Sequence, residues 1–234
     1  MTTHTTSSAA LDHHRAASAR RDPATRALLI AGAAAGPLFY LSATVQMATR
    51  PGFDLRVHPI SQLSTGELGW IQMTTFVLAG LGLVCLAIAR RRVVTTGIGR
   101  GAVPVLIALG GLGFIVAGLF PQDAAYGFPV GAADGPAAET SWHAAVHMAA
   151  AIIAFTALAA AVVVALVRAI RGRRVAAAIG DGIVALVLLL PVMPEIASVQ
   201  VAITGVFAFG WCTVVAGRRL CSLTRVLESE KKRS

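Results

Sequence analysis

Histidine and carboxylate residues that could move protons occur in a few short stretches of the sequence. His143 and His147 are four residues apart, so on a helix both imidazoles project from one face, one turn from each other. His58 and Asp123 lie in two other polar stretches. An imidazole oriented by a carboxylate can take up and release a proton near neutral pH. We therefore predict that His58, Asp123, His143 and His147 are the catalytic residues of an acid–base site.

Further polar and aromatic residues in the same stretches are expected to contact a substrate. Asp54, Ser61 and Glu67 share a loop with His58, and loops held by a rigid scaffold often carry binding residues. Tryptophans in such positions also suit the interface of a membrane with water. The predicted substrate-binding residues are Asp54, Ser61, Glu67, Trp70, Gln72 and Trp142.

The same residues allow other interpretations. Two histidines four residues apart could bind a divalent metal, with His58 as a third ligand, but residues 143–147 lack the glutamate of a zinc peptidase. Ser61 could be a nucleophile, although the chain has no Gly-x-Ser-x-Gly elbow. Histidine and aspartate at helix ends could also simply cap helices and bind loop carbonyls. We expect no metal site, and the sequence identifies no cofactor.

The elements that must position these residues are membrane spans. Of the 234 residues 56% are hydrophobic and only 13% are charged, whereas soluble domains carry about 25% charged residues. Six stretches have the roughly 20 apolar residues that a membrane helix needs, and none alternates as a barrel strand does. We predict an all-α integral membrane bundle of six transmembrane helices over residues 27–220. The predicted spans are 27–48, 69–89, 101–120, 143–167, 175–192 and 197–217.

The placement of the basic residues predicts the orientation of the bundle. Eighteen of the 20 Lys and Arg residues lie in the two termini and in the second and fourth connections, and only Arg50 and Arg56 lie elsewhere. By the positive-inside rule both termini are cytoplasmic, as a disordered tail over residues 1–26 and a basic tail over residues 221–234. The net charge of +9 is then an orientation signal beside anionic lipid, and we expect no nucleic acid partner.

The loops carry a resemblance to a known family. The segments concerned are RPGFD (50–54), HPISQLS (58–64), GELGWIQ (66–72), GLFPQD (118–123), GFP (127–129) and SWHAAVH (141–147). Together they resemble the two long outer loops of a bacterial family of multi-pass membrane proteins, the domain of unknown function 998. The resemblance covers roughly residues 27–220 and implies a six-helix bundle, but no established reaction, substrate or cofactor. Residues 202–204 depart from a Gly-Leu/Phe-Gln-Arg-like stretch of that family, so an activity that needs this arginine would differ here.

The sequence therefore predicts a multi-pass protein of the inner (plasma) membrane with a polar pocket on the extracytoplasmic side. One hypothesis is an enzyme that applies acid–base chemistry to an apolar lipid or isoprenoid, for example in terpene cyclisation. The alternative is a non-enzymatic component for binding, sensing or transport. Transport is disfavoured because we expect no ionisable residue at the centres of the spans. The expected partners are membrane lipids and an apolar small molecule, and the sequence does not predict the oligomeric state.

Overall fold

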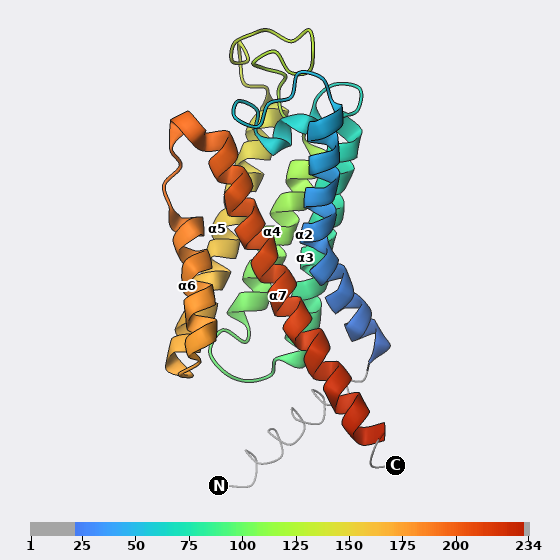
Figure 1. Ribbon diagram of the computed structural model, residues 1–234, viewed down its shortest axis with the longest axis vertical. Coiled ribbons are helices and arrows are strands. Elements are labelled where there is room, and N and C mark those ends of the chain that lie inside the picture. Colours follow the sequence, from blue (N-terminus) through green and yellow to red (C-terminus); the bar gives the residue numbers. More distant parts are fainter. Residues whose placement is uncertain (1–21, 232–234) are drawn as a thin grey trace.

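The computed structural model describes residues 22–231, and all regular structure in that range is helical. The all-α prediction is confirmed, and the helices form an elongated bundle (Figure 1). Its elements are α2 (Pro23–Thr49), η1 (Ile60–Ser64), α3 (Gly69–Val93), α4 (Ala102–Leu119), α5 (Trp142–Arg171), α6 (Val175–Leu189), η2 (Pro194–Ile196) and α7 (Ala197–Lys231).

Five of the helices are long and apolar enough to cross a membrane: α2, α3, α4, α5 and the segment Pro194–Arg225, which joins η2 to most of α7. Helix α6 is apolar but has only 15 residues. At about 1.5 Å per residue it rises about 22 Å, less than the roughly 30 Å of a hydrocarbon core. The fifth span, predicted over 175–192, is therefore only partly helical.

Capping residues explain where two of the helices begin. Asp22 accepts a hydrogen bond from the Ala24 amide, and Pro23 occupies the first helical position, so α2 starts before the predicted residue 27. Ser141 caps α5 by accepting from the Ala144 amide. At the other end of the chain α7 continues to Lys231, through most of the predicted tail. The predicted tail residues 1–21 lie outside the described residues.

Small residues let the helices approach closely. Helices α2, α3, α4 and α5 pack against one another in chain order, while α7 packs on α2 and α6 on α5. A Cβ atom on Gly111 of α4 would lie 2.7 Å from the Gly80 carbonyl oxygen of α3. A Cβ on Gly32 of α2 would lie 2.6 Å from the Cβ of Leu86. Helices that associate without a hydrophobic driving force depend on such close contact.

An extended segment of residues 190–193 follows α6 and leads up to α7 (Figure 1). Gln200 of α7 satisfies its backbone: the side-chain Oε1 accepts from the Met193 amide at 2.7 Å, and Nε2 donates to the Pro191 carbonyl at 2.7 Å. Pro191 itself cannot donate a helical hydrogen bond. The side chain of Gln200 thus replaces part of the hydrogen bonding that the backbone loses where α6 ends.

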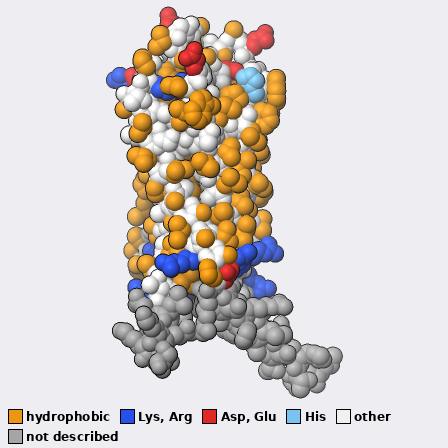
Figure 2. Space-filling model, turned by 90° about the vertical axis from the view of Figure 1, so that its right-hand side faces the viewer, with side chains coloured by type: hydrophobic (Ala, Val, Ile, Leu, Met, Phe, Trp, Pro, Cys, Tyr) orange, Lys and Arg blue, Asp and Glu red, His pale blue; other side chains and the backbone are white. Residues whose placement is uncertain are grey.

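The two ends of the bundle differ in charge. The loops 50–68 and 120–141 lie together at one end, where most of the visible acidic side chains and a histidine are seen, while basic side chains gather toward the other end (Figure 2). The expectation that span centres hold no ionisable residue is wrong for Asp181. This residue lies in the middle of α6, where its Oδ1 accepts a hydrogen bond from Trp211 Nε1 at 2.9 Å.

Candidate functional site

His58 ties the two long loops together. Its Nδ1 accepts the Asp54 amide at 2.9 Å, so its Nε2 carries the proton and donates to the Tyr126 carbonyl of the other loop at 2.9 Å. The buried ring packs between Phe53 and Phe128. Both ring nitrogens of His58 are thus engaged by backbone, and neither faces a ligand.

The remaining charged groups of the first loop serve the loop itself or face outward. Asp54 forms an exposed ion pair with Arg56 at 2.6 Å, and hydrogen bonds from Arg56 lower the pKa of Asp54 to about 2. Arg50 is buried, donates to the Leu63 and Thr65 carbonyls and lies over the Phe128 ring. Glu67 is exposed.

Asp123 and His143 meet at the start of α5. The Ser141 hydroxyl donates to Asp123 Oδ1 at 2.5 Å, and the Ser141 amide donates to Oδ2 at 2.8 Å. The same hydroxyl oxygen lies 2.8 Å from His143 Nδ1. Burial alone would raise the pKa of Asp123, but the hydrogen bonds from Ser141 outweigh it and lower the pKa. This cluster fastens the second loop to the first turn of α5.

Three of the predicted substrate-binding residues lie apart from these clusters. Gln72 is wholly buried and accepts from Gln46 Nε2 at 2.7 Å, which joins α3 to α2. Trp70 is 63% exposed and Trp142 is 69% exposed, as expected of residues that anchor a helix end at a membrane surface.

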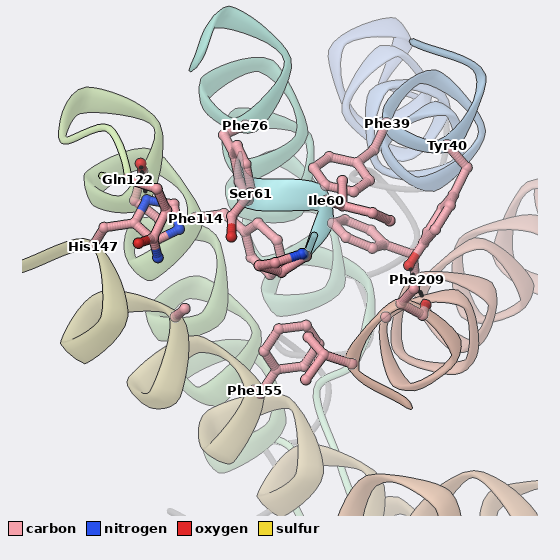
Figure 3. A pocket seen from close by; sticks show the side chains of 16 residues that line it. Phe39, Tyr40, Ile60, Ser61, Phe76, Phe114, Gln122, His147, Phe155 and Phe209 are labelled. Atoms are coloured by element: carbon pink, nitrogen blue, oxygen red, sulfur yellow. Dashed lines mark hydrogen bonds between the residues drawn. The ribbon is translucent and has the colours of Figure 1, made fainter. Parts of the chain in front are cut away.

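A cavity of about 610 Å³ lies beneath η1, between α2, α3, α4, α5 and α7 (Figure 3). We call it the aromatic cavity, because five phenylalanines and a tyrosine line it: Phe39, Tyr40, Phe76, Phe114, Phe155 and Phe209. Several of these rings contact one another, with Phe39 stacked on Phe209 at 5.3 Å between centroids. A mostly apolar, aromatic lining with a few polar groups is typical of a small-molecule site.

His147 brings an imidazole to the wall of the aromatic cavity (Figure 3). Its Nδ1 lies 2.7 Å from the Ala117 carbonyl and 2.9 Å from the Phe120 carbonyl, both at the end of α4. Two carbonyl acceptors require that Nδ1 carry the proton, so Nε2 of the neutral ring holds the lone pair. Among the described residues no group is hydrogen-bonded to Nε2.

The polar groups of the aromatic cavity are neutral and lie near one end of it. Ser61 of η1, Gln122 and His147 contribute them, and no Asp, Glu, Lys or Arg is among the described residues that line the cavity. The Tyr40 hydroxyl is already engaged, because it donates to the Ala202 carbonyl at 2.8 Å. The cavity thus offers hydrogen bonds to a neutral group and an apolar surface to the rest of a ligand.

Of the residues predicted from the sequence, the structure brings only Ser61 and His147 into this cavity. Nowhere among the described residues do three His, Cys, Asp or Glu side chains come close enough together to hold a metal ion. The aromatic residues and Gln122 were missed. A signal for them exists, since Phe39, Phe76, Phe114, Phe155 and Phe209 each lie inside a different predicted span, away from the interfacial belts.

Comparison with known proteins agrees with the loop motifs. Neither the curated proteins nor the solved structures include a match to this chain. The model of one family, described as protein of unknown function (DUF998), matches residues 33–218, which include every residue that lines the aromatic cavity. The chain belongs to this family of proteins of unknown function, DUF998.

Proposed function

We propose that the chain crosses the plasma membrane six times, with both termini in the cytoplasm. The fifth crossing along the chain would be α6 extended by residues 190–193, where Gln200 hydrogen-bonds to the backbone of Pro191 and Met193. The sequence supports this orientation, because 18 of the 20 Lys and Arg residues belong to the two termini and to the second and fourth connections. The aromatic cavity then lies in the extracytoplasmic half, beneath the two loops.

The function that the geometry supports best is binding of an apolar molecule with a neutral hydrogen-bonding head group, such as an isoprenoid or lipid alcohol. The phenylalanine rings would cover the apolar body, and Ser61 and Gln122 would contact the head group beside His147. A charged head group is disfavoured because the described lining offers it no counter-ion.

Acid–base chemistry at His147 is the second part of this proposal. The observation that carries it is the free Nε2 lone pair, held at the cavity wall by the bonds from Nδ1 to α4. A proton taken from one carbon or oxygen of the ligand by Nε2 could return to another position, so a single imidazole suffices for an isomerisation. Aromatic faces around it would stabilise the imidazolium that exists while the ring holds this proton.

Binding without chemistry is the alternative, and one observation favours it. Apart from His147 and Tyr40, the described residues of the cavity wall have no ionisable side chain, and the Tyr40 hydroxyl is engaged by Ala202. A site that only binds or senses its ligand would need no more than this.

Nuclear magnetic resonance of nitrogen-labelled histidine tests the proposal. In delipidated protein kept in detergent, the His147 signals should report a proton on Nδ1, and its Nε2 signal should move when an apolar membrane extract is added. His143, outside the cavity, should not respond. A His147→Asn variant keeps a donor near Nδ1 but loses Nε2, so it should retain the bound molecule and lose any conversion of it. An Nε2 signal that ignores every apolar extract would overturn the proposal.

A further inference from the structure

A second cavity lies at the opposite end of the bundle from the two loops, between α3, α5, α6 and α7. Its volume is about 810 Å³. Five arginines and a single carboxylate, Asp181, are the charged residues of its described lining, and we call it the arginine cavity. The arginines are Arg90, Arg168, Arg174, Arg218 and Arg219. These residues belong to the basic groups that set the predicted orientation, but an orientation signal does not require that they surround a hollow.

Each of the two inner arginines has one buried donor without an acceptor among the described residues. Arg90 is only 7% exposed, and its Nε is buried with no hydrogen-bond partner among the described residues. Arg168 Nη1 is also buried without a partner there. One oxygen of the nearby carboxylate is engaged elsewhere, because Asp181 Oδ1 accepts from Trp211 Nε1. A buried guanidinium donor without an acceptor is costly, and the missing partner must be negative or carry oxygen acceptors.

Exposure of the arginines increases along the cavity. Arg174 and Arg218 are exposed, Arg168 is half-buried and Arg90 is buried. An anion that enters the cavity from solvent would thus first meet the exposed arginines and then lose its water beside Arg90. Planar guanidinium groups match the oxygens of phosphate, which they bind through paired hydrogen bonds.

We infer that the arginine cavity binds a phosphate-type anion, with Arg90 and Arg168 as its inner contacts. Basic pockets between membrane helices on the cytoplasmic side are suited to phospholipid head groups, and inorganic phosphate offers the same oxygens. The site rests on the orientation proposed above, but it uses none of the residues of the aromatic cavity, so it stands or fails independently of the ligand proposed for that cavity.

The test measures binding to the full chain in a neutral detergent. The probes are short-chain phosphatidic acid, inorganic phosphate and, as a zwitterionic control, short-chain phosphatidylcholine. The variants are Arg90→Gln and Arg168→Gln, and the matched control is Arg171→Gln, an exposed arginine of the same helix as Arg168 that does not line the cavity. Thermal unfolding of each variant identifies any that misfolds. If Arg90→Gln misfolds, Arg168→Gln still tests the inference.

We expect phosphatidic acid to bind more tightly than phosphatidylcholine and each cavity variant to weaken it about tenfold or more, with Arg171→Gln nearly unchanged. Competition by inorganic phosphate at equal affinity would identify free phosphate as the ligand, and no competition would identify the lipid head group. Two results would overturn the inference. The first is that neither phosphatidic acid nor inorganic phosphate binds. The second is that all three arginine variants weaken binding equally, which is what diffuse attraction to a basic surface predicts.

Discussion

The Nδ1 atom of His147 lies 2.7 Å from the carbonyl oxygen of Ala117, and this bond joins α5 to the last turn of α4. The helix end has carbonyls without helical partners, and His147 supplies a donor to them. The same bond decides which ring nitrogen carries the proton. A structural role on one side of the imidazole therefore leaves a lone pair on the other side, on a residue that lines the aromatic cavity.

Replacing His147 separates these two roles. His147→Ala should destabilise the protein by about 2 kcal/mol or more, because two buried carbonyls lose their donor and a buried ring is lost. His147→Asn should cost clearly less, since its amide can still donate to α4. Thermal unfolding in detergent compares the stability of the two variants. Equal losses of stability would show that the hydrogen bond from Nδ1 contributes little.

The helical architecture could be predicted because hydropathy and span length act locally. The sequence also explains why α6 ends at Leu189, since Pro191 cannot continue a helix. The partners of the segment that follows could not be predicted, because they belong to Gln200, a residue of the next helix that satisfies the backbone at Pro191 and Met193. The end of α7 was also missed, since a polar sequence can continue a helix that packing has already started.

Loss of the bridge at His58 should loosen the two loops without unfolding the bundle. In His58→Ala the Asp54 amide and the Tyr126 carbonyl lose their partner, and the ring no longer packs on Phe128. Amide hydrogen exchange in residues 50–68 and 120–141 should increase about tenfold or more, with the helices unchanged. The exposed Glu67→Ala in the same loop serves as control. Unchanged exchange in His58→Ala would contradict the role given to this residue.

The anchor at Asp123 should weaken in acid. Its pKa is lower in the folded protein than in an unfolded chain, so the carboxylate stabilises the fold above its ordinary pKa of about 3.9. This stability is lost as the pH falls from there toward the lower folded value. Amide exchange at the start of α5 should therefore rise below about pH 4, and Asp123→Asn should remove this pH dependence.

Asp54 is the control for that titration, because hydrogen bonds from Arg56 lower its pKa to about 2 within the other loop. Asp54→Asn should leave the acid response at the start of α5 in place. If Asp54→Asn abolished it and Asp123→Asn did not, the anchor would be assigned to the wrong carboxylate.

The proposed topology predicts which cysteine probes react from outside the cell. With Cys85, Cys212 and Cys221 replaced by serine or alanine, Val130→Cys in the second loop should react with an impermeant thiol reagent in intact cells. Thr96→Cys, between α3 and α4, should react only after the membrane is opened. Both sites are exposed in the structure. The reverse pattern would place the aromatic cavity in the cytoplasmic half.

The site itself could be predicted only in part. The four-residue spacing placed His143 and His147 on one face, but the helix carries them to different surroundings: His143 contacts the cap residue Ser141, and His147 is 2% exposed at the cavity. The type of a polar residue does not reveal whether its side chain is already hydrogen-bonded to backbone groups, as both ring nitrogens of His58 are. The cavity depends on five phenylalanines from five helices, whose meeting is set by packing across the bundle.

Filling the aromatic cavity tests the central claim most directly. Ala151→Phe places a ring in the cavity, while Ala149→Phe adds the same ring to an exposed position two residues earlier on α5. Apolar compounds that remain with the purified protein are extracted and compared by mass spectrometry. We predict a compound that accompanies the wild type and Ala149→Phe and is reduced about tenfold or more in a folded Ala151→Phe. Equal amounts of every retained compound in all three proteins would contradict a ligand site in this cavity.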